Sequence, residues 1–270
     1  MKTSYWKTLS YTGLILAVAL IISLFSDFHN ALAQSYSGKK VEIVIDPGNK
    51  LNISGYVQIA YAWGEQLSPP YNLLRGIINL KEAMNKWTKV ETSLDNHLVL
   101  GTDRLLKMPF VFITTKDAFQ LTETEKKNLQ KYFMNGGFMV VENAEPRGDY
   151  SRGGASLKQM LRDTIPNARF SPIPDSHPIY HCFFDFDDGP PNGAEIGLFG
   201  GNTNNFNRML MSKRIFALEG VWYKDRLVAV YSDKGYIVKW NDNANNEPQL
   251  KMGVNFIVYA LTQKGGIARK

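Results

Sequence analysis

The residues best suited to chemistry in this chain are one acid and two closely spaced histidines. Glu142 directly follows the apolar run Phe138–Val141, and His177 and His181 are the only two histidines that lie close together. A carboxylate and an imidazole are the side chains that most often transfer protons in hydrolysis. If folding brings Glu142 to either histidine, we expect a site for acid/base catalysis.

The same two histidines are the candidate ligands of a metal ion. Residues four apart in a strand point to one side but lie about 13 Å apart, which is too far for them to share an ion. A turn at Pro178 would shorten this distance. Further ligands could come from Glu142, Asp149, Asp185 and Asp187. We expect structural roles for His177 and His181 and no cofactor, and a metal bound by the two histidines is the alternative.

The one cysteine does not fit a catalytic nucleophile. Cys182 lies between His181 and Phe183 with no glycine beside it. A nucleophilic cysteine of an amidotransferase occupies a sharp turn between a strand and a helix, with a histidine as its base. We therefore expect Cys182 to be a small buried residue and expect no glutamine amidotransferase activity. With a single cysteine, the chain forms no internal disulfide.

An acidic segment opens a long irregular stretch. Asp185–Gly189 resembles the start of a calcium-binding loop, but Ile196 stands at the twelfth position, where an EF-hand requires glutamate. An EF-hand is therefore excluded, and we expect a solvated acidic loop. Glycine, asparagine and proline are frequent over residues 185–212, which predicts an irregular insertion in the domain.

Strand and helix patterns alternate along the chain, which predicts an α/β fold with a mostly parallel central sheet. The expected strands are Val41–Ile45, Tyr56–Tyr61, Pro109–Thr114, Phe138–Val141 and Ile179–Phe184. The segments Arg214–Tyr223 and Leu227–Tyr231 are expected to form a β-hairpin near the C-terminus.

Helices are expected between these strands. Ser68 and Pro69 fit an N-cap and a first helical position, followed by an apolar stripe that extends to Met84. Thr122 and Glu125 form a capping-box pair at the start of a helix that ends at Gly136 and Gly137. Two more helices are expected at Leu157–Arg162 and Gln249–Gln263.

This arrangement predicts where a ligand would bind. In an open parallel sheet, ligands bind beyond the carboxyl ends of the strands. Strand ends and the following helix bring six candidate ligand-binding residues to that edge: Asn72, Arg75, Thr114, Thr115, Glu142 and Asn143. The alternative is that these residues only cap helices and hold loops in place.

The N-terminus has the layout of a secretory signal. Lys2 and Lys7 precede the apolar segment Gly13–Phe25, and Ala31-Leu32-Ala33 provides a small-residue cleavage site. The apolar segment is shorter than the ~20 residues of a membrane-spanning helix. We therefore expect export to the periplasm or another extracytoplasmic compartment, a signal peptide over residues 1–33 and a single α/β domain over residues 34–270. An uncleaved N-terminal membrane anchor is the alternative.

The composition limits the classes of partner. A hydrophobic content of 44% with 21% charged residues is typical of a folded globular protein. The net charge of +6 comes from scattered lysines and arginines, so we expect no nucleic-acid binding. Scattered positive charge is compatible with peripheral association with anionic membrane surfaces.

Five sequence blocks, in this order along the chain, resemble the bacterial domain-of-unknown-function family 4159. The likeness extends over roughly residues 56–262, and the blocks are YNLL at 71–74, MPFVFITT with LTETEKKNLQKYFMNGGFMVVEN at 108–143, HPIYH at 177–181, ALEGVWYKDRLVAVYS at 217–232 and KMGVNFIVYALT at 251–262. The resemblance implies a flavodoxin-like three-layer sandwich of the class I glutamine amidotransferase type. It implies no established activity.

Members of this family often have two aspartates after the strand that here ends in Glu142 and Asn143. The family also implies partners: its genes often accompany those of MoxR-type ATPases and von Willebrand factor A proteins, which suggests assembly or quality control. Two hypotheses follow. The first is a non-enzymatic binding or assembly module of the cell envelope that engages a protein partner or a small ligand. The second is a metal-assisted or acid/base hydrolase that uses Glu142 with His177 or His181.

Overall fold

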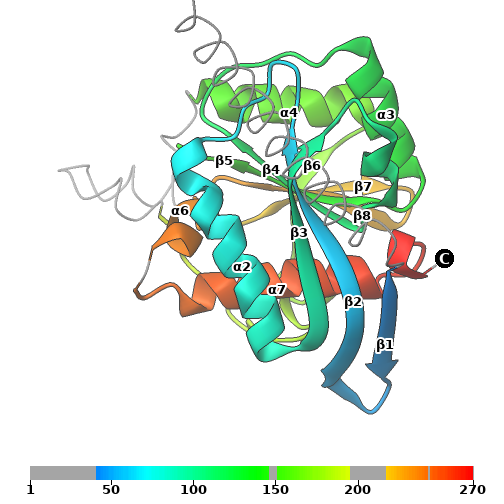
Figure 1. Ribbon diagram of the computed structural model, residues 1–270, viewed down its shortest axis with the longest axis vertical. Coiled ribbons are helices and arrows are strands. Elements are labelled where there is room, and N and C mark those ends of the chain that lie inside the picture. The colour runs from blue at the N-terminus through cyan, green and yellow to red at the C-terminus, as the bar shows by residue number, and fades with distance from the viewer. Residues whose placement is uncertain (1–40, 146–150, 195–216, 243, 270) are drawn as a thin grey trace, which may run out of the picture. The chain divides into compact units, whose positions relative to one another are not determined.

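The computed structural model describes residues 41–145, 151–194, 217–242 and 244–269 (Figure 1). The predicted signal segment, residues 1–33, lies outside the described residues, as do Asp149 and most of the predicted insertion. The described chain is a mixed α/β domain in which helices pack on an open sheet of eight strands. Within these residues, no helix is both long and apolar enough to cross a membrane.

The sheet combines parallel and antiparallel pairs. Its strands are β1 (Glu42–Asp46), β2 (Asn49–Trp63), β3 (Lys89–Val99), β4 (Phe110–Thr115), β5 (Phe138–Asn143), β6 (Phe170–Pro172), β7 (Glu219–Tyr223) and β8 (Arg226–Ser232). They follow the order β1-β2-β4-β5-β8-β7-β6, and β3 also pairs with β2. The pairs β2–β3, β2–β4, β4–β5 and β5–β8 are parallel, and the β1–β2, β6–β7 and β7–β8 pairs are antiparallel.

Helices cover both faces of the sheet (Figure 1). The helices are α2 (Leu74–Trp87), α3 (Glu123–Met134), α4 (Arg152–Thr164), α6 (Tyr236–Asn241) and α7 (Glu247–Thr262), with short 3-10 helices η1 (Tyr71–Leu73), η2 (Asp103–Lys107), η3 (Pro178–Tyr180) and η5 (Ile267–Arg269). Helices α2, α6 and α7 share one hydrophobic core, and α3 and α4 share the other.

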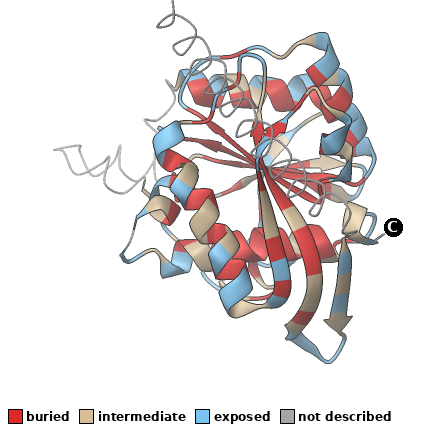
Figure 2. Cartoon of the chain, in the orientation of Figure 1, coloured by how far each residue is buried: buried red, intermediate tan, exposed pale blue. Residues whose placement is uncertain are grey.

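The central strands are buried on both sides, as their apolar runs predict. In β4, Phe110 and Phe112 face the first core, and Val111 and Ile113 face the second. Buried residues accordingly concentrate in the middle of the sheet, and exposed residues lie on the outer sides of the helices (Figure 2). Successive residues of one strand point to opposite faces, so a strand that is covered on both faces needs apolar side chains at every position.

The structure confirms the predictions for helix α3 and for the C-terminal hairpin. Thr122 and Glu125 form a complete capping box, and Gly136, just beyond the end of the helix, adopts a φ of 96°. Strands β7 and β8 form the expected antiparallel hairpin. Helix α4 starts at Arg152, five residues before the expected start at Leu157, because Ser151 caps it by accepting from the Gly154 N–H.

Two expectations about secondary structure are wrong, and one strand was not predicted. No helix starts at Pro69, because a residue before a proline avoids helical geometry and Pro70 is itself extended. The segment Ile179–Phe184 is not a strand: Pro178 opens the 3-10 helix η3, capped by the side chain of His177. Strand β3 is missing from the prediction because its alternation is broken by polar residues and it pairs only with β2.

Candidate functional site

Glu142 lies at the carboxyl edge of the sheet and is fully buried. Its Oε1 accepts hydrogen bonds from the Ser232 hydroxyl at 2.7 Å and the Tyr236 N–H at 2.9 Å. Its Oε2 accepts from the Ile237 N–H at 2.6 Å. The carboxylate therefore satisfies two of the N–H groups that the first turn of α6 leaves without partners within the helix.

The residues around Glu142 belong to the same interior. Thr114 is fully buried, and its hydroxyl donates to the backbone carbonyl of Glu142 at 2.7 Å. The Tyr61 hydroxyl is buried and has no hydrogen-bond partner among the described residues. Burial, together with the negative charge of Glu142, raises the pKa of Tyr61, so this hydroxyl stays neutral. Thr115, the next residue of β4, is almost fully buried, and its hydroxyl oxygen accepts a hydrogen bond from the Asp117 N–H.

A second polar cluster lies at the same edge of the sheet. The Asn143 amide donates to Asp233 Oδ1 at 2.9 Å, and the Tyr231 hydroxyl donates to the same oxygen at 2.7 Å. The Asn143 Oδ1 accepts from the Ser151 hydroxyl at 2.8 Å and from the Glu145 N–H at 3.2 Å. This chain of hydrogen bonds connects the end of β8 to the N-cap of α4.

Asp233 is the titratable group of this second cluster. Burial raises its pKa, and the hydrogen bonds from Asn143 and Tyr231 oppose that rise. Lys158 also lowers it, whereas Glu219, the ion-pair partner of Lys158, raises it. A carboxyl group whose ionised form is disfavoured by its surroundings is a frequent property of functional sites.

We expect Asp233→Asn to keep or slightly raise stability at neutral pH, by at most about 1 kcal/mol, because asparagine retains the acceptor and removes a buried charge. The raised pKa means that the folded protein holds the proton more tightly than the unfolded chain. Wild-type stability therefore falls as pH rises from the ordinary value of 3.8 through the raised value. Chemical denaturation at weakly acidic and neutral pH measures this slope. A clear loss of stability for the variant at neutral pH would contradict it.

The two histidines lie apart from both clusters. His177 accepts from the Ile179 N–H through Nδ1, and its ring packs near Trp222 and Tyr259. Burial lowers its pKa, which favours the neutral ring. His181 bonds through Nε2 to the Asp175 carbonyl. None of the hydrogen bonds or ring contacts described for either histidine involves Glu142.

The acids near His181 are used in other contacts. Asp185 accepts from Lys50 at 2.6 Å, and this ion pair lowers its pKa. Asp185 also lies 3.4 Å from His181 Nδ1, and Asp187 lies 3.9 Å from the same atom. In the part of the chain that the structure describes, no three histidine, cysteine, aspartate or glutamate residues are grouped so that they could hold a metal ion.

Cys182 has the surroundings of a structural thiol. Its sulfur lies 3.3 Å from the Asn255 carbonyl, and burial raises its pKa to about 12. The reactive form of cysteine is the thiolate, which this environment disfavours. The residue lies in a turn after η3, so it is also not at a junction between a strand and a helix.

Asn72 and Arg75, by contrast, are exposed. They flank the junction of η1 and α2, next to Tyr71, whose side chain is 83% exposed. The Arg75 Nε donates to Asn79 at 3.0 Å, and Asn79 donates in turn to the Trp240 carbonyl of α6. The predicted ligand-binding residues therefore fall into two groups: four are buried in the edge of the sheet, and two lie on the surface.

Sequence reasoning missed Ser232, Asp233 and the start of α6. Only the position of Ser232 at the end of a predicted strand pointed to that edge. The one backbone signal was Gly235, which has a φ of 66° and directly precedes α6. A six-residue helix is too short to show a clear hydrophobic period.

The structure is therefore a mixed α/β domain. The acids at the carboxyl edge of its sheet, Glu142 and Asp233, form hydrogen bonds with backbone and side-chain groups of the same chain. The chain belongs to the family DUF4159, described as a domain of unknown function, whose family model matches residues 58–261. The match confirms the family indicated by the sequence blocks. No curated protein matches the chain.

Proposed function

We propose that this chain is an exported α/β domain of the cell envelope that acts as a non-enzymatic binding or assembly module. The observation that carries the proposal is the division of the carboxyl edge. Glu142, Thr114 and Ser232 are buried and hydrogen-bonded there, and Asp233 is half-buried and hydrogen-bonded. Tyr71, Asn72 and Arg75, by contrast, are presented to solvent. Such an edge is better suited to docking a partner than to transferring a proton.

The exposed group has the composition of a docking surface for a protein. Tyrosine and arginine are enriched among residues that dominate binding energy at interfaces. Tyr71 lies in η1 and Arg75 in the first turn of α2, so the two exposed side chains lie close together along the chain where the helix begins. Because Asn79 holds the Arg75 Nε, the guanidinium loses less conformational freedom on binding, and its terminal nitrogens suit a carboxylate of the partner.

The export part of this proposal rests on the signal layout of residues 1–33, with periplasmic or other extracytoplasmic location and cleavage after Ala33. An uncleaved anchor would leave the domain on the same side of the membrane. For the fold, we propose the flavodoxin-like, class I glutamine amidotransferase-like three-layer type. The order of the five parallel strands, β3-β2-β4-β5-β8, supports it, since it follows the flavodoxin order 2-1-3-4-5.

Retention of partners from an envelope extract tests the docking surface. We expect Tyr71→Ser and Arg75→Gln each to reduce the retained partner by at least roughly tenfold, because truncating one dominant contact costs about 2 kcal/mol or more and about 1.4 kcal/mol is already tenfold in affinity. Met134→Ser is the matched control, since Met134 is 51% exposed on α3, which covers the other face of the sheet. Equal retention by all three variants would contradict the proposed surface.

An acid/base hydrolase is the second candidate, and Asp233 is the observation in its favour. Its raised pKa and its position at the carboxyl edge suit a proton-transferring group better than the contacts of His177 or His181 do. In this reading Asp233 takes the role first assigned to Glu142. A hydrolytic activity that Asp233→Asn abolishes, with the fold intact, would favour this candidate over the binding module.

A further inference from the structure

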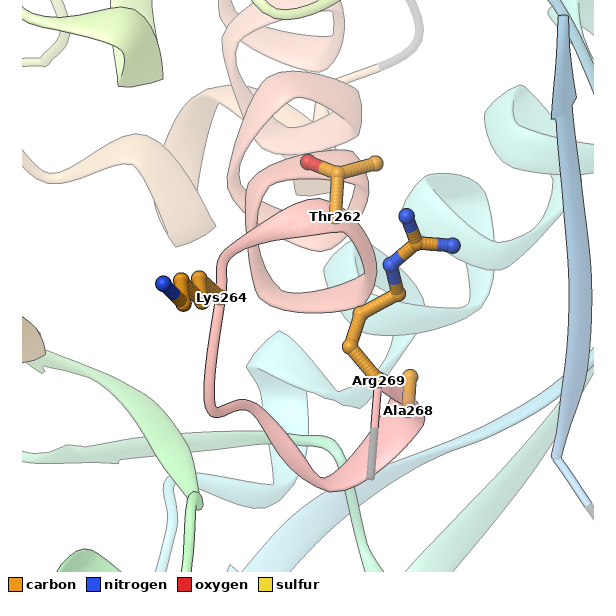
Figure 3. Close-up of a pocket in the computed structure, with 4 residues that line it drawn as sticks. All are labelled: Thr262, Lys264, Ala268 and Arg269. Carbon is orange, nitrogen blue, oxygen red and sulfur yellow. The ribbon is translucent and has the colours of Figure 1, made fainter.

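A pocket of about 430 Å³ lies beyond the C-terminal end of α7. Thr262, Lys264, Ala268 and Arg269 line it (Figure 3). Figure 3 shows the Arg269 side chain extending toward Thr262, whereas Lys264 projects to the other side of the same turn. Because lysine has a flexible four-carbon stem, rotation of the Lys264 side chain suffices to bring its ammonium group toward the pocket.

The backbone around this pocket is held by hydrogen bonds. The Gln263 N–H donates to the Tyr259 carbonyl, and the Arg269 N–H donates to the Gly266 carbonyl at 3.0 Å. The Ile267 N–H donates to the Gly136 carbonyl at 3.0 Å. Gly136 lies just ahead of β5, so the pocket is at the amino edge of the sheet, whereas Glu142 and Asp233 lie at the carboxyl edge. This is a second location, independent of the proposed docking surface.

The two cations at the pocket have no acidic partner among the described residues. Several other cations pair with acids: Lys50 with Asp185, Arg104 with Asp95, Lys126 with Glu123, Lys158 with Glu219 and Lys251 with Glu247. Neither Lys264 nor Arg269 forms an ion pair with any residue that the structure describes. Both are exposed, so their charges are available to a ligand from solution.

Positive charge after a helix also complements the negative end of the helix dipole, with or without a ligand. This effect alone requires neither a concave surface nor a hydroxyl. Figure 3 shows the Thr262 methyl group, not its hydroxyl, on the side toward which Arg269 extends, and the hydroxyl donates to the Tyr259 carbonyl at 3.5 Å. The pocket itself is therefore the feature that the dipole does not explain. Its volume lies within the range of about 300–1,000 Å³ that is usual for small-molecule sites.

We propose that this pocket binds a small molecule through a phosphate group. The Arg269 guanidinium provides the main contact, because its planar fork matches two phosphate oxygens. Lys264 supplies the second positive charge that a dianionic phosphate requires. The same chemistry would serve the phosphate of a soluble metabolite or of a lipid headgroup.

Titration of the full chain with pyrophosphate, followed by calorimetry and by backbone NMR shifts, tests the site. We expect saturable binding with shifts confined to residues around Thr262–Arg269 and an affinity that falls as salt is added. Arg269→Gln should weaken binding roughly tenfold, as expected for a lost charge-assisted contact of about 1.4 kcal/mol. Lys264→Gln should weaken it by about threefold. Lys251→Gln, a cation on α7 that is paired with Glu247, is the matched control and should bind as wild type does.

Vesicles separate the two sources of phosphate. If wild type binds vesicles of phosphatidylglycerol better than those of phosphatidylcholine, and Arg269→Gln loses only that difference, the phosphate belongs to a lipid headgroup. Pyrophosphate affinity that is equal in wild type and Arg269→Gln, or absent binding in both arms, would overturn the proposal. Melting temperatures of the variants should fall by at most about 2–4 °C, because both side chains are exposed, make no ion pair with the described residues and contribute only their interaction with the helix dipole.

Discussion

Glu142→Gln is expected to lower the melting temperature by roughly 6–12 °C, for a loss of about 3 kcal/mol in a domain of this size. Glu142 Oε1 accepts hydrogen bonds from the Ser232 hydroxyl and the Tyr236 N–H, and Oε2 accepts one from the Ile237 N–H. A glutamine offers one oxygen and one NH₂ group. Its NH₂ group would face an N–H donor at the start of α6, leaving that donor buried and unsatisfied.

Thermal unfolding followed by circular dichroism measures the effect, and Glu65→Gln is the matched control because Glu65 is exposed. A double-mutant cycle with Ser232→Ala isolates the bond between the two side chains. A functional acid would behave differently, since its removal keeps or raises stability while binding or activity falls. If Glu142→Gln has an unchanged melting temperature but no longer retains the partner, Glu142 has a functional role and not a structural one.

Gly76→Ala is expected to destabilise the domain by about 2 kcal/mol, or roughly 4–8 °C in melting temperature. Alanine is favoured over glycine within a helix by about 1 kcal/mol, which on its own would make the variant more stable. The added Cβ would lie 2.7 Å from the Ile237 carbonyl oxygen and 3.3 Å from the Asn241 N. These are backbone atoms of α6, so the helix itself must move, and this steric cost exceeds the gain in helix propensity.

The control for this substitution is Gly101→Ala, where the nearest atoms to an added Cβ lie 3.9 Å away. We expect its free energy of unfolding to stay within about 0.5 kcal/mol of wild type. Urea denaturation of both variants measures the difference. If Gly76→Ala were as stable as wild type, the close packing of α2 against α6 would be wrong, and with it the positions of Arg75 and Glu142.

The sequence predicted the parts of the fold in which local chemistry and burial agree. Strands β4 and β5 are apolar at successive positions because both faces are covered, and the capping box of Thr122 and Glu125 marks the start of α3 without ambiguity. It also predicted a structural role for Cys182, which stays a prediction; burial raises the pKa of this thiol. These signals lie within a few residues of one another, so a linear sequence contains them.

Contacts between distant segments were decided only by the tertiary structure. Glu142 meets Ser232 and Ile237 across some ninety residues of chain, and no local pattern marks α6 as the helix that a buried acid would cap. Asn143 and Asp233 meet in the same way. The sequence brought Glu142 and the histidines into one hypothesis because their residue types suit the same chemistry. In the folded chain Glu142 lies apart from the histidines. A buried carboxylate needs hydrogen-bond donors, and only the tertiary structure decides which backbone groups lie close enough to provide them.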